Sequence, residues 1–391
     1  MAALAAGWLT IAWVIQDVTD HYFEGHWFGL PVIIAAASGL LLSLRSDRRG
    51  AWLILLAAAG AGIVEHLWRP AVSQSNVLAE IAQASDLLRG GHDPYRALGS
   101  QMVDGVYLYP PGPLVLYGSL ASIGVAPITV ERATSILTVV LLAATARWIG
   151  PGRAALVTAM YGTYLFGTFR ALDGDNNSTL ALLFLGASLL LMRAETPDRA
   201  GRIAFWASVP VLALGILMKQ LAWPVYAFIA LYLAGTRRGR WHVAATLAVV
   251  GLAILPFAID DPGMLPRMLA VVGNKPTVYG LNLLGILQMF DPALAARLIP
   301  ATLVVQVGVA ALAAVALTRT GSRDIPDALT RSLGVMLALM LLSSWTSPAY
   351  YMFMGSILLL VVAVAGVRSP RPSRGLGWSD LRRGGATAAV P

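Results

Sequence analysis

The sequence predicts an all-α, polytopic membrane protein with about 12 transmembrane helices. Hydrophobic residues make up 57% of the 391 residues and charged residues only 12%, whereas soluble domains carry about 25% charged residues. The apolar residues form continuous runs and do not alternate with polar ones, as they would in the strands of a membrane barrel. This composition excludes a soluble domain and a disordered chain.

The composition also limits the possible chemistry. The chain has no cysteine, which excludes thiolate catalysis, disulfides and cysteine-based zinc sites. Its five histidines are scattered singly, so we expect neither a metal nor a cofactor. The net charge of +8 comes mainly from arginines in short loops, a pattern typical of the cytoplasmic side of membrane proteins rather than of nucleic-acid binding.

We predict twelve membrane-spanning segments from the apolar runs. They are 1–16, 28–45, 51–68, 129–149, 154–170, 178–193, 203–218, 221–235, 242–259, 300–318, 329–345 and 351–367. The first run lacks a preceding basic region, and we therefore interpret it as a span and not as a cleaved signal peptide.

Basic loops determine the predicted orientation. Five of them lie an even number of spans apart, so one orientation places all five in the cytoplasm, together with both termini. They contain Arg45/Arg48/Arg49, Arg147/Arg153, Arg193/Arg199/Arg202, Arg237/Arg238/Arg240 and Arg319/Arg323. The tail 368–391 is rich in Arg, Gly, Pro and Ser; we predict that it is disordered and lies against anionic inner-leaflet lipids of the plasma membrane.

The same orientation places two long loops outside, at 69–128 and 260–299. Within the first, residues 112–126 are apolar but short. Counting them as a full span would invert the sidedness of the segments up to residue 193. We therefore interpret them as a re-entrant or interfacial segment, which is tolerated at membrane depth where protein or a watery cavity covers it.

An outer amphipathic helix is predicted over residues 76–89. Its apolar positions have helical spacing, and Gly90-Gly91 would end it. Asn76, Glu80 and Gln83 share one face of this helix. That face either contributes to a site or is simply solvated.

Tyr109 belongs to a Tyr-Pro-rich run, 107–113, where the chain re-enters the membrane. Prolines cannot extend a helix, and tyrosines suit the membrane interface. Tyr109 is thus either a substrate contact or part of an ordinary interfacial turn.

Polar groups stand directly before the span 178–193. They are Asp173, Asp175, Asn176, Asn177 and Ser178. The first three are candidate substrate contacts. The alternative is that Ser178 or Asn177 is an N-cap and that the aspartates favour the helix dipole. The spacing does not fit a calcium-binding loop.

Lys219 and Gln220 interrupt an apolar stretch of two short spans. A lysine there is costly unless it pairs or snorkels to the interface. We predict that Lys219 binds an anion such as a lipid phosphate, with Gln220 beside it and Lys275, the other lysine of the chain, assisting.

Two further outer segments mix aromatic groups with amides or hydroxyls, a combination that suits sugar stacking and hydrogen bonding. Tyr279 lies in the segment 274–282, and Trp345 and Tyr350 lie in the segment 343–351.

The order of these motifs resembles the GT-C superfamily of integral-membrane glycosyltransferases. The motifs are LLRGGHDPY, YLYPP, GDNNS, MKQ, NKPTVYGLNLLGIL and SSWTSPAYY. They are most similar to family 87, the actinobacterial polyprenol-phosphate-mannose-dependent mannosyltransferases. The likeness covers residues 51–367, so that 1–50 would be two additional N-terminal spans.

The resemblance implies inverting transfer of mannose, or another hexose or pentose, from a polyprenyl phosphate to a glycolipid or glycan on the outer face. It also implies a carboxylate base on the first outer helix. The family has an aspartate where this chain has Asn76, and an amide cannot act as a base. Glu80, one turn later on the same face, is the expected substitute.

Two other functions remain open. Asn76 favours a non-catalytic relative that binds or moves polyprenyl-linked sugars. A transporter is the third reading, although transporters often show internal repeats and polar residues at the membrane midplane, and neither is visible in this sequence.

Overall fold

A computed structural model of the chain describes residues 48–68, 77–96, 107, 109–162, 177–220, 222–266, 268, 278–280, 282–346, 354–355, 357–359 and 361. Helices dominate the described residues, which confirms the predicted fold class. Six helical stretches in this part of the chain are long and apolar enough to cross a membrane. They comprise α3 (Arg48–Trp68), α6 (Pro127–Ala144) with α7 (Ala146–Ile149), α10 (Asn177–Ala194), α11 (Arg199–Met218), α13 (Arg237–Asp260) and α16 (Pro292–Thr320).

Shorter helices complete the described structure. They are α4 (Val77–Arg89), α5 (Gly112–Ala121), α8 (Pro151–Gly162), α12 (Ala222–Ala234), α15 (Leu283–Gln288) and α17 (Ile325–Leu341). Within the described residues, each predicted span between residues 51 and 345 overlaps a helix; residues 163–170 of the predicted span 154–170 lie outside the described residues. The predicted spans 1–16 and 28–45 lie outside the described residues, as does most of 351–367.

Several helices begin earlier than the apolar runs that predicted them, α13 and α16 by the most. Thr236 caps α13 by accepting a hydrogen bond from the Gly239 amide at 2.9 Å, and Asp291 caps α16 by accepting one from the Leu294 amide at 2.9 Å. Polar caps satisfy the free amides of the first turn. The helices therefore start at these caps rather than where hydrophobicity rises.

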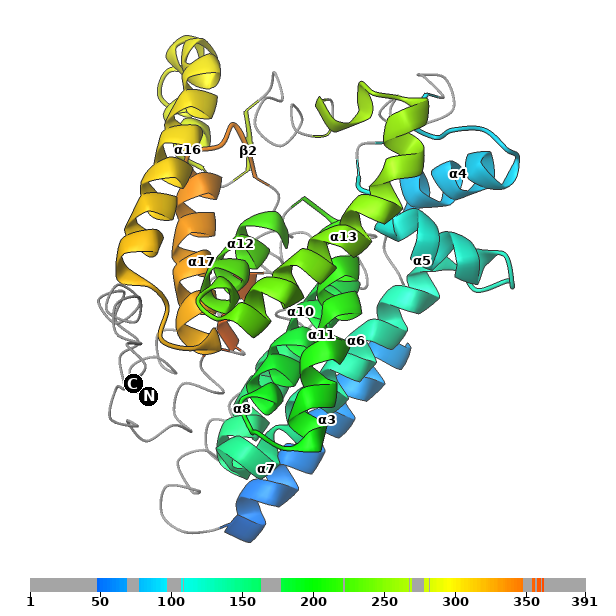
Figure 1. The fold of residues 1–391 in the computed structure, drawn as a ribbon, viewed down its shortest axis with the longest axis vertical. Helices are drawn as coiled ribbons and strands as arrows, with labels where there is room; N and C mark the ends of the chain where they lie inside the picture. The colour runs from blue at the N-terminus through cyan, green and yellow to red at the C-terminus, as the bar shows by residue number, and fades with distance from the viewer. Residues whose placement is uncertain are drawn as a thin grey trace, which may run out of the picture.

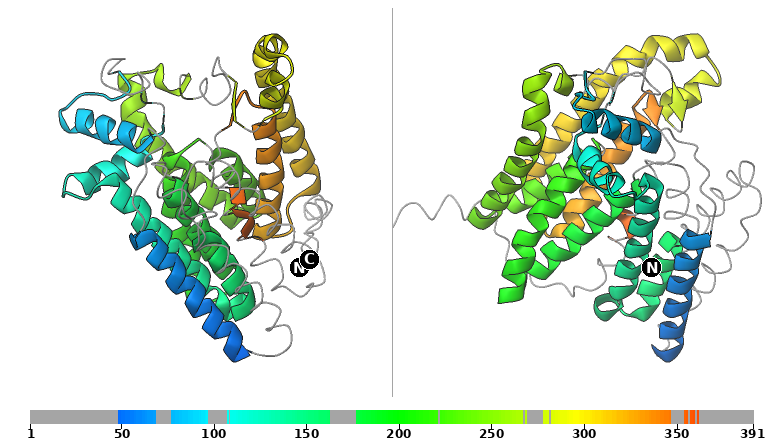
Figure 2. Two further views of the ribbon diagram at one scale, coloured as in Figure 1. Left: turned by 180° about the vertical axis from the view of Figure 1, so that it is seen from behind. Right: turned by 90° about the vertical axis from the view of Figure 1, so that its right-hand side faces the viewer.

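The helices form two flanks around a central group. In Figure 1, α3, α6 and α8 lie beside α10 and α11, whereas α16 and α17 lie on the other side next to α12. The views in Figure 2 agree that α4 and α5 lie on the flank opposite α16 and α17. Helices α3 and α8 approach closely: a Cβ on Gly62 would lie 2.9 Å from the Gly162 Cα, and small residues permit such contacts between membrane helices.

The helix ends form two groups, which correspond to the predicted basic loops and the predicted outer loops. The C-terminal end of α13, the start of α16 and the helix α4 lie at one end of the molecule in Figure 1. The N-terminal ends of α3, α11 and α13, which carry predicted basic loops, point to the other end. We call the first the α4 end and the second the arginine end.

The segment predicted to be re-entrant forms α5, a helix of 10 residues. It is too short to span a bilayer, which takes about 20 residues. It packs against α4, α6 and α11. A departure from the all-helical prediction is a two-residue parallel pairing of β1 (Tyr279–Gly280) with β2 (Trp345–Thr346).

Candidate functional site

Helix α5 holds α4 against the end of α11. A Cβ on Gly112, at the start of α5, would lie 2.6 Å from the backbone carbonyl of Leu217, so glycine is needed for this approach. A Cβ on Gly118 would lie 3.1 Å from Ser85 Oγ on α4. The first contact brings the Tyr-Pro segment next to the end of α11, where Lys219 follows.

The LLRGGHDPY motif ends α4 and buries a tyrosine. The His92 amide donates to the Leu87 carbonyl at 2.9 Å, and Gly91 takes a φ of 78°, a left-handed conformation that suits glycine. Asp93 Oδ1 then accepts a hydrogen bond from the Tyr95 amide at 2.9 Å and thereby fixes this turn. The turn directs Tyr95, only 1% exposed, into the molecule.

Three tyrosines form a cluster that joins the two motifs. The Tyr95 hydroxyl donates to the Tyr109 carbonyl at 2.8 Å. The Tyr95 and Tyr107 rings meet edge to face at 5.3 Å, and the Tyr107 and Tyr109 rings do so at 5.8 Å. On its other side Tyr95 meets Phe257 of α13 at 5.3 Å. The LLRGGHDPY and YLYPP motifs are therefore in direct contact.

Burial keeps the two inner tyrosines protonated. It raises the pKa of Tyr95 well above its ordinary value, and Asp93 raises it further. Burial likewise raises the pKa of Tyr107, with further contributions from Tyr95, Tyr109 and Glu80. Both phenols are therefore hydrogen-bond donors at neutral pH.

Lys219 lies buried at the end of α11, with 3% of its surface exposed. This burial excludes snorkelling to solvent as the reason for its position. Its Nζ donates to Asn177 Oδ1 at 3.1 Å and lies 5.8 Å from the centre of the Tyr109 ring, within the range of a cation–π contact. The C-terminal end of a helix also favours a cation. These contacts orient the ammonium.

The first turn of α10, which begins at Asn177, is held by a buried carboxylate on α6. Glu131, 0% exposed, accepts hydrogen bonds from the Ser178 amide at 3.0 Å and the Thr179 amide at 3.3 Å. The hydroxyls of Tyr117 and Thr179 also donate to it. Glu131 therefore fixes the first turn of α10, where Asn177 meets Lys219.

Glu80 lies on α4 and is buried, with 2% exposed. The alternative of a solvated face at this position is wrong. Its charge contributes to the raised pKa of Tyr107. A buried carboxylate is costly unless nearby groups compensate it.

The structure thus brings two residues predicted from the sequence together, Tyr109 and Lys219. Gln220 is buried next to Lys219, and its carbonyl accepts from the Trp223 amide at 3.0 Å. Tyr279 and Trp345 are register partners in the β1–β2 pair, which joins two segments predicted separately. The other predicted residues lie outside the described residues; they are Asn76, Asp173, Asp175, Asn176, Lys275 and Tyr350.

Sequence reasoning missed two residues of this site. Asn177 was considered only as a helix cap, yet its amide oxygen meets Lys219. Glu131 was not considered at all, although an acidic residue inside an apolar run is a signal for a buried polar role. Among the described residues, no group of three His, Asp or Glu side chains could hold a metal ion.

No protein-family model and no curated protein matches the chain. Similar solved structures include two of ArnT from Cupriavidus metallidurans, one bound to undecaprenyl phosphate and one in the apo state. Their TM-scores are 0.49 and 0.48, at 16% identity over 80% of this chain. The chain covers 59% of the length of each. This likeness of arrangement assigns no role to any residue of the chain.

Proposed function

We propose that the chain transfers a sugar from a polyprenyl phosphate to a hydroxyl of a glycolipid or glycan acceptor at the α4 end. The observation that carries this proposal is a buried lysine against Tyr109 of the tyrosine cluster. A buried glutamate on α4 supports it, because the charge of Glu80 acts on Tyr107 of the same cluster. A sugar phosphate on a lipid needs two groups: a cation for the leaving phosphate and a base for the attacking hydroxyl. Lys219 and Glu80 supply these two chemistries.

In the proposed reaction the acceptor oxygen attacks the anomeric carbon while Glu80 takes its proton. The bond between that carbon and the phosphate oxygen breaks, and polyprenyl phosphate leaves with its charge beside Lys219. Attack opposite the leaving group inverts the anomeric centre. Because the Ser178 and Thr179 amides already donate to Glu131, the phosphate is assigned to Lys219 and not to the start of α10.

The donor sugar is proposed to be mannose or another hexose or pentose, as the resemblance to family 87 implies. We further propose that the α4 end faces outside, that both termini are cytoplasmic, and that Tyr279, Trp345 and Tyr350 contact sugar. Lys275 and the segment containing Asp173, Asp175 and Asn176 are proposed to complete the substrate contacts.

A transfer assay with purified protein and a synthetic polyprenyl-phosphate sugar tests this function. Glu80→Gln should lower turnover by about 10²–10⁴-fold, the usual cost of losing a general base. Asp86→Asn is the matched control, because Asp86 lies on the same helix but is exposed and paired with Arg89. Equal rates for wild type and Glu80→Gln would remove Glu80 as the base.

A second candidate is a non-catalytic protein that binds polyprenyl-linked sugars, favoured by Asn76 at the family's aspartate position. Asn76→Asp distinguishes the two. If the wild-type protein shows no sugar transfer and the Asn76→Asp variant does, the natural chain is a non-catalytic relative. Transfer by the wild-type protein supports the enzyme.

A further inference from the structure

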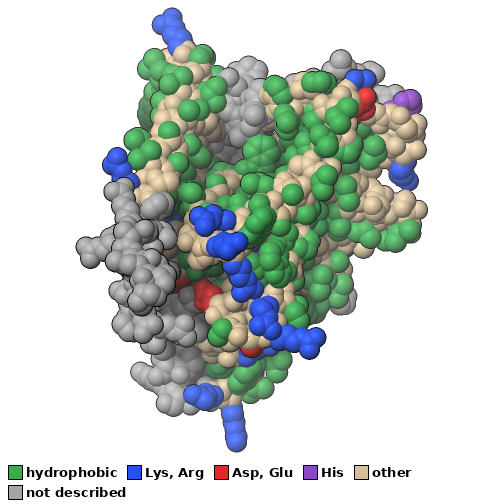
Figure 3. Space-filling view, in the orientation of Figure 1, with side chains coloured by type: hydrophobic (Ala, Val, Ile, Leu, Met, Phe, Trp, Pro, Cys, Tyr) green, Lys and Arg blue, Asp and Glu red, His purple; other side chains and the backbone are tan. Residues whose placement is uncertain are grey.

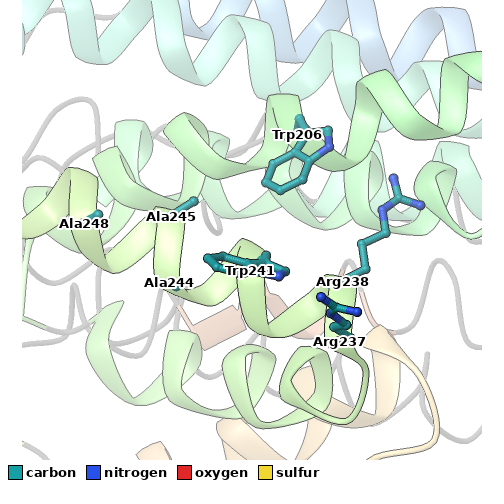
Figure 4. A pocket seen from close by; sticks show the side chains of 7 residues that line it. All are labelled: Trp206, Arg237, Arg238, Trp241, Ala244, Ala245 and Ala248. Atoms are coloured by element: carbon teal, nitrogen blue, oxygen red, sulfur yellow. The ribbon is translucent and has the colours of Figure 1, made fainter.

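A groove of ≈ 800 Å³ is lined by residues from the N-terminal halves of α11 and α13, at the arginine end and away from the site described above. Trp206 of α11 faces Trp241 of α13 across it, and Arg237 and Arg238 lie at one end. Ala244, Ala245 and Ala248 continue the same wall along α13 (Figure 4). A second hollow, which shares Trp206, is lined by Arg199 and Arg202 of α11.

The wall of the groove is held by buried contacts. His242 is fully buried, and its Nε2 forms a hydrogen bond with Ser208 Oγ at 2.7 Å. The His242 ring stacks on Trp206 at 6.4 Å, and Phe205 meets both rings edge to face. The Arg238 guanidinium lies over the Phe205 ring at 4.1 Å. These contacts fix one indole and one guanidinium of the groove in place.

The charged side chains that line the two hollows are all basic. Four arginines line the two hollows, and no Asp or Glu is among their lining residues. Figure 3 shows basic side chains gathered in a diagonal band across the lower part of this face, surrounded by hydrophobic ones. Guanidinium groups bind phosphate with two parallel hydrogen bonds, so this region suits a phosphate that is attached to something apolar.

The length of the groove matches one leaflet of a bilayer. Trp206 and Trp241 are 47% and 63% exposed, as expected for indoles at a membrane interface. From Arg237 to Ala248 the helix rises about 16 Å, which is about half the ~30 Å hydrocarbon thickness. A ligand with its phosphate at the arginines and a chain along the alanines therefore has the dimensions of a phospholipid.

We propose that an anionic phospholipid binds in this groove. Its phosphate lies between Arg237 and Arg238, with Arg199 and Arg202 adding positive charge. One acyl chain lies along Ala244, Ala245 and Ala248, between the two indoles. The lipid would brace α11 against α13 at the end opposite the tyrosine cluster, and its binding does not depend on the proposed transfer reaction.

Native mass spectrometry of the full chain in detergent, titrated with phosphatidylglycerol or phosphatidylcholine, tests this site. The variant with Arg237→Gln and Arg238→Gln should bind phosphatidylglycerol at least about tenfold more weakly. Arg48→Gln with Arg49→Gln is the matched control, because it removes the same charge from another Arg-Arg-Gly helix start at the same end. The control should change the affinity by no more than about twofold.

A second variant tests the chain-binding part without changing charge. Ala248→Trp adds a ring at an exposed position on the groove wall and should weaken phosphatidylglycerol binding, whereas soluble glycerol phosphate should not displace the lipid. Three results would overturn the proposal: equal losses in the two double variants, unchanged binding in Ala248→Trp, or displacement by glycerol phosphate. The first would indicate unspecific charge attraction, and the other two a site for phosphate alone.

Discussion

Buried contacts link Lys219 at the end of α11 to Asn177 of α10, and link the next two residues of α10 to Glu131 of α6. Each polar group has a partner on another helix, as burial requires. The sequence singled out Lys219, because a lysine inside an apolar stretch is expensive. It could not supply the partners, since Asn177 and Glu131 lie 42 and 88 residues away along the chain (219 − 177 and 219 − 131). Only the packing of the three helices reveals them.

Glu131 is therefore predicted to position Lys219 without touching substrate. Glu131→Ala should leave buried donors on Tyr117 and Thr179 without this acceptor, at a cost of about 1–3 kcal/mol. It should also weaken polyprenyl-phosphate binding, because the first turn of α10 then loses its anchor. Melting temperature and lipid affinity, measured on the same sample, provide the test.

Thr138→Val is the control for Glu131. Thr138 lies on the same helix, is 1% exposed, and donates only locally to the Thr134 carbonyl at 2.8 Å. If Glu131→Ala and Thr138→Val changed lipid affinity equally, the effect would be general destabilisation of α6 and not positioning.

Helix α5 and the turn after α4 organise the site at the scale of elements. The sequence predicted both: the glycine pair ends α4 at Arg89, and the prolines precede α5. It did not predict that Gly112 would lie against α11, because a close approach is a property of two elements together. For the same reason the pairing of β1 with β2 was not foreseen.

The turn at Asp93 should respond to pH. Burial raises the pKa of Asp93, the Tyr95 amide opposes this, and Asp260 and Asp261 of the α13 end raise it further. The exposed Arg96 pairs with Asp260 at 3.5 Å. Since the folded chain binds this proton more tightly than the unfolded chain, stability should fall as pH rises from the ordinary carboxyl pKa through the raised one.

Asp93→Asn tests this dependence, because the amide oxygen can still accept from the Tyr95 amide. The variant should be as stable as wild type at low pH and more stable at neutral pH, as measured by thermal unfolding at both pH values. A lower melting temperature of Asp93→Asn at neutral pH would mean that the ionised carboxylate stabilises the turn.

The whole molecule has two chemically different ends. Basic residues gather where α11 and α13 begin, and the buried polar cluster lies where α4 and α5 meet α11. The positive-inside pattern predicted this separation from the parity of the loops alone. It could not predict how deeply the polar cluster is buried, because depth depends on the short helices α4 and α5 that cover it.

Labelling of single cysteines tests the sidedness, and the natural chain has no cysteine to interfere. Cysteines at Asp93 and Lys275 should react with an impermeant reagent applied to intact cells, whereas one at Arg238 should react only after lysis. If the cysteine at position 238 were labelled in intact cells and the other two were protected, the predicted orientation would be wrong. The proposed active site would then face the cytoplasm.

The affinity of the purified chain for polyprenyl phosphate, with and without the Lys219 charge, tests the account most directly. Lys219→Met should lower the affinity about 10- to 100-fold, because a charge-assisted contact to the phosphate is lost, and Lys219→Arg should restore part of it. Melting temperatures measured in parallel identify a fold that has failed. Wild-type affinity in a folded Lys219→Met variant would contradict the assignment of the phosphate to this lysine.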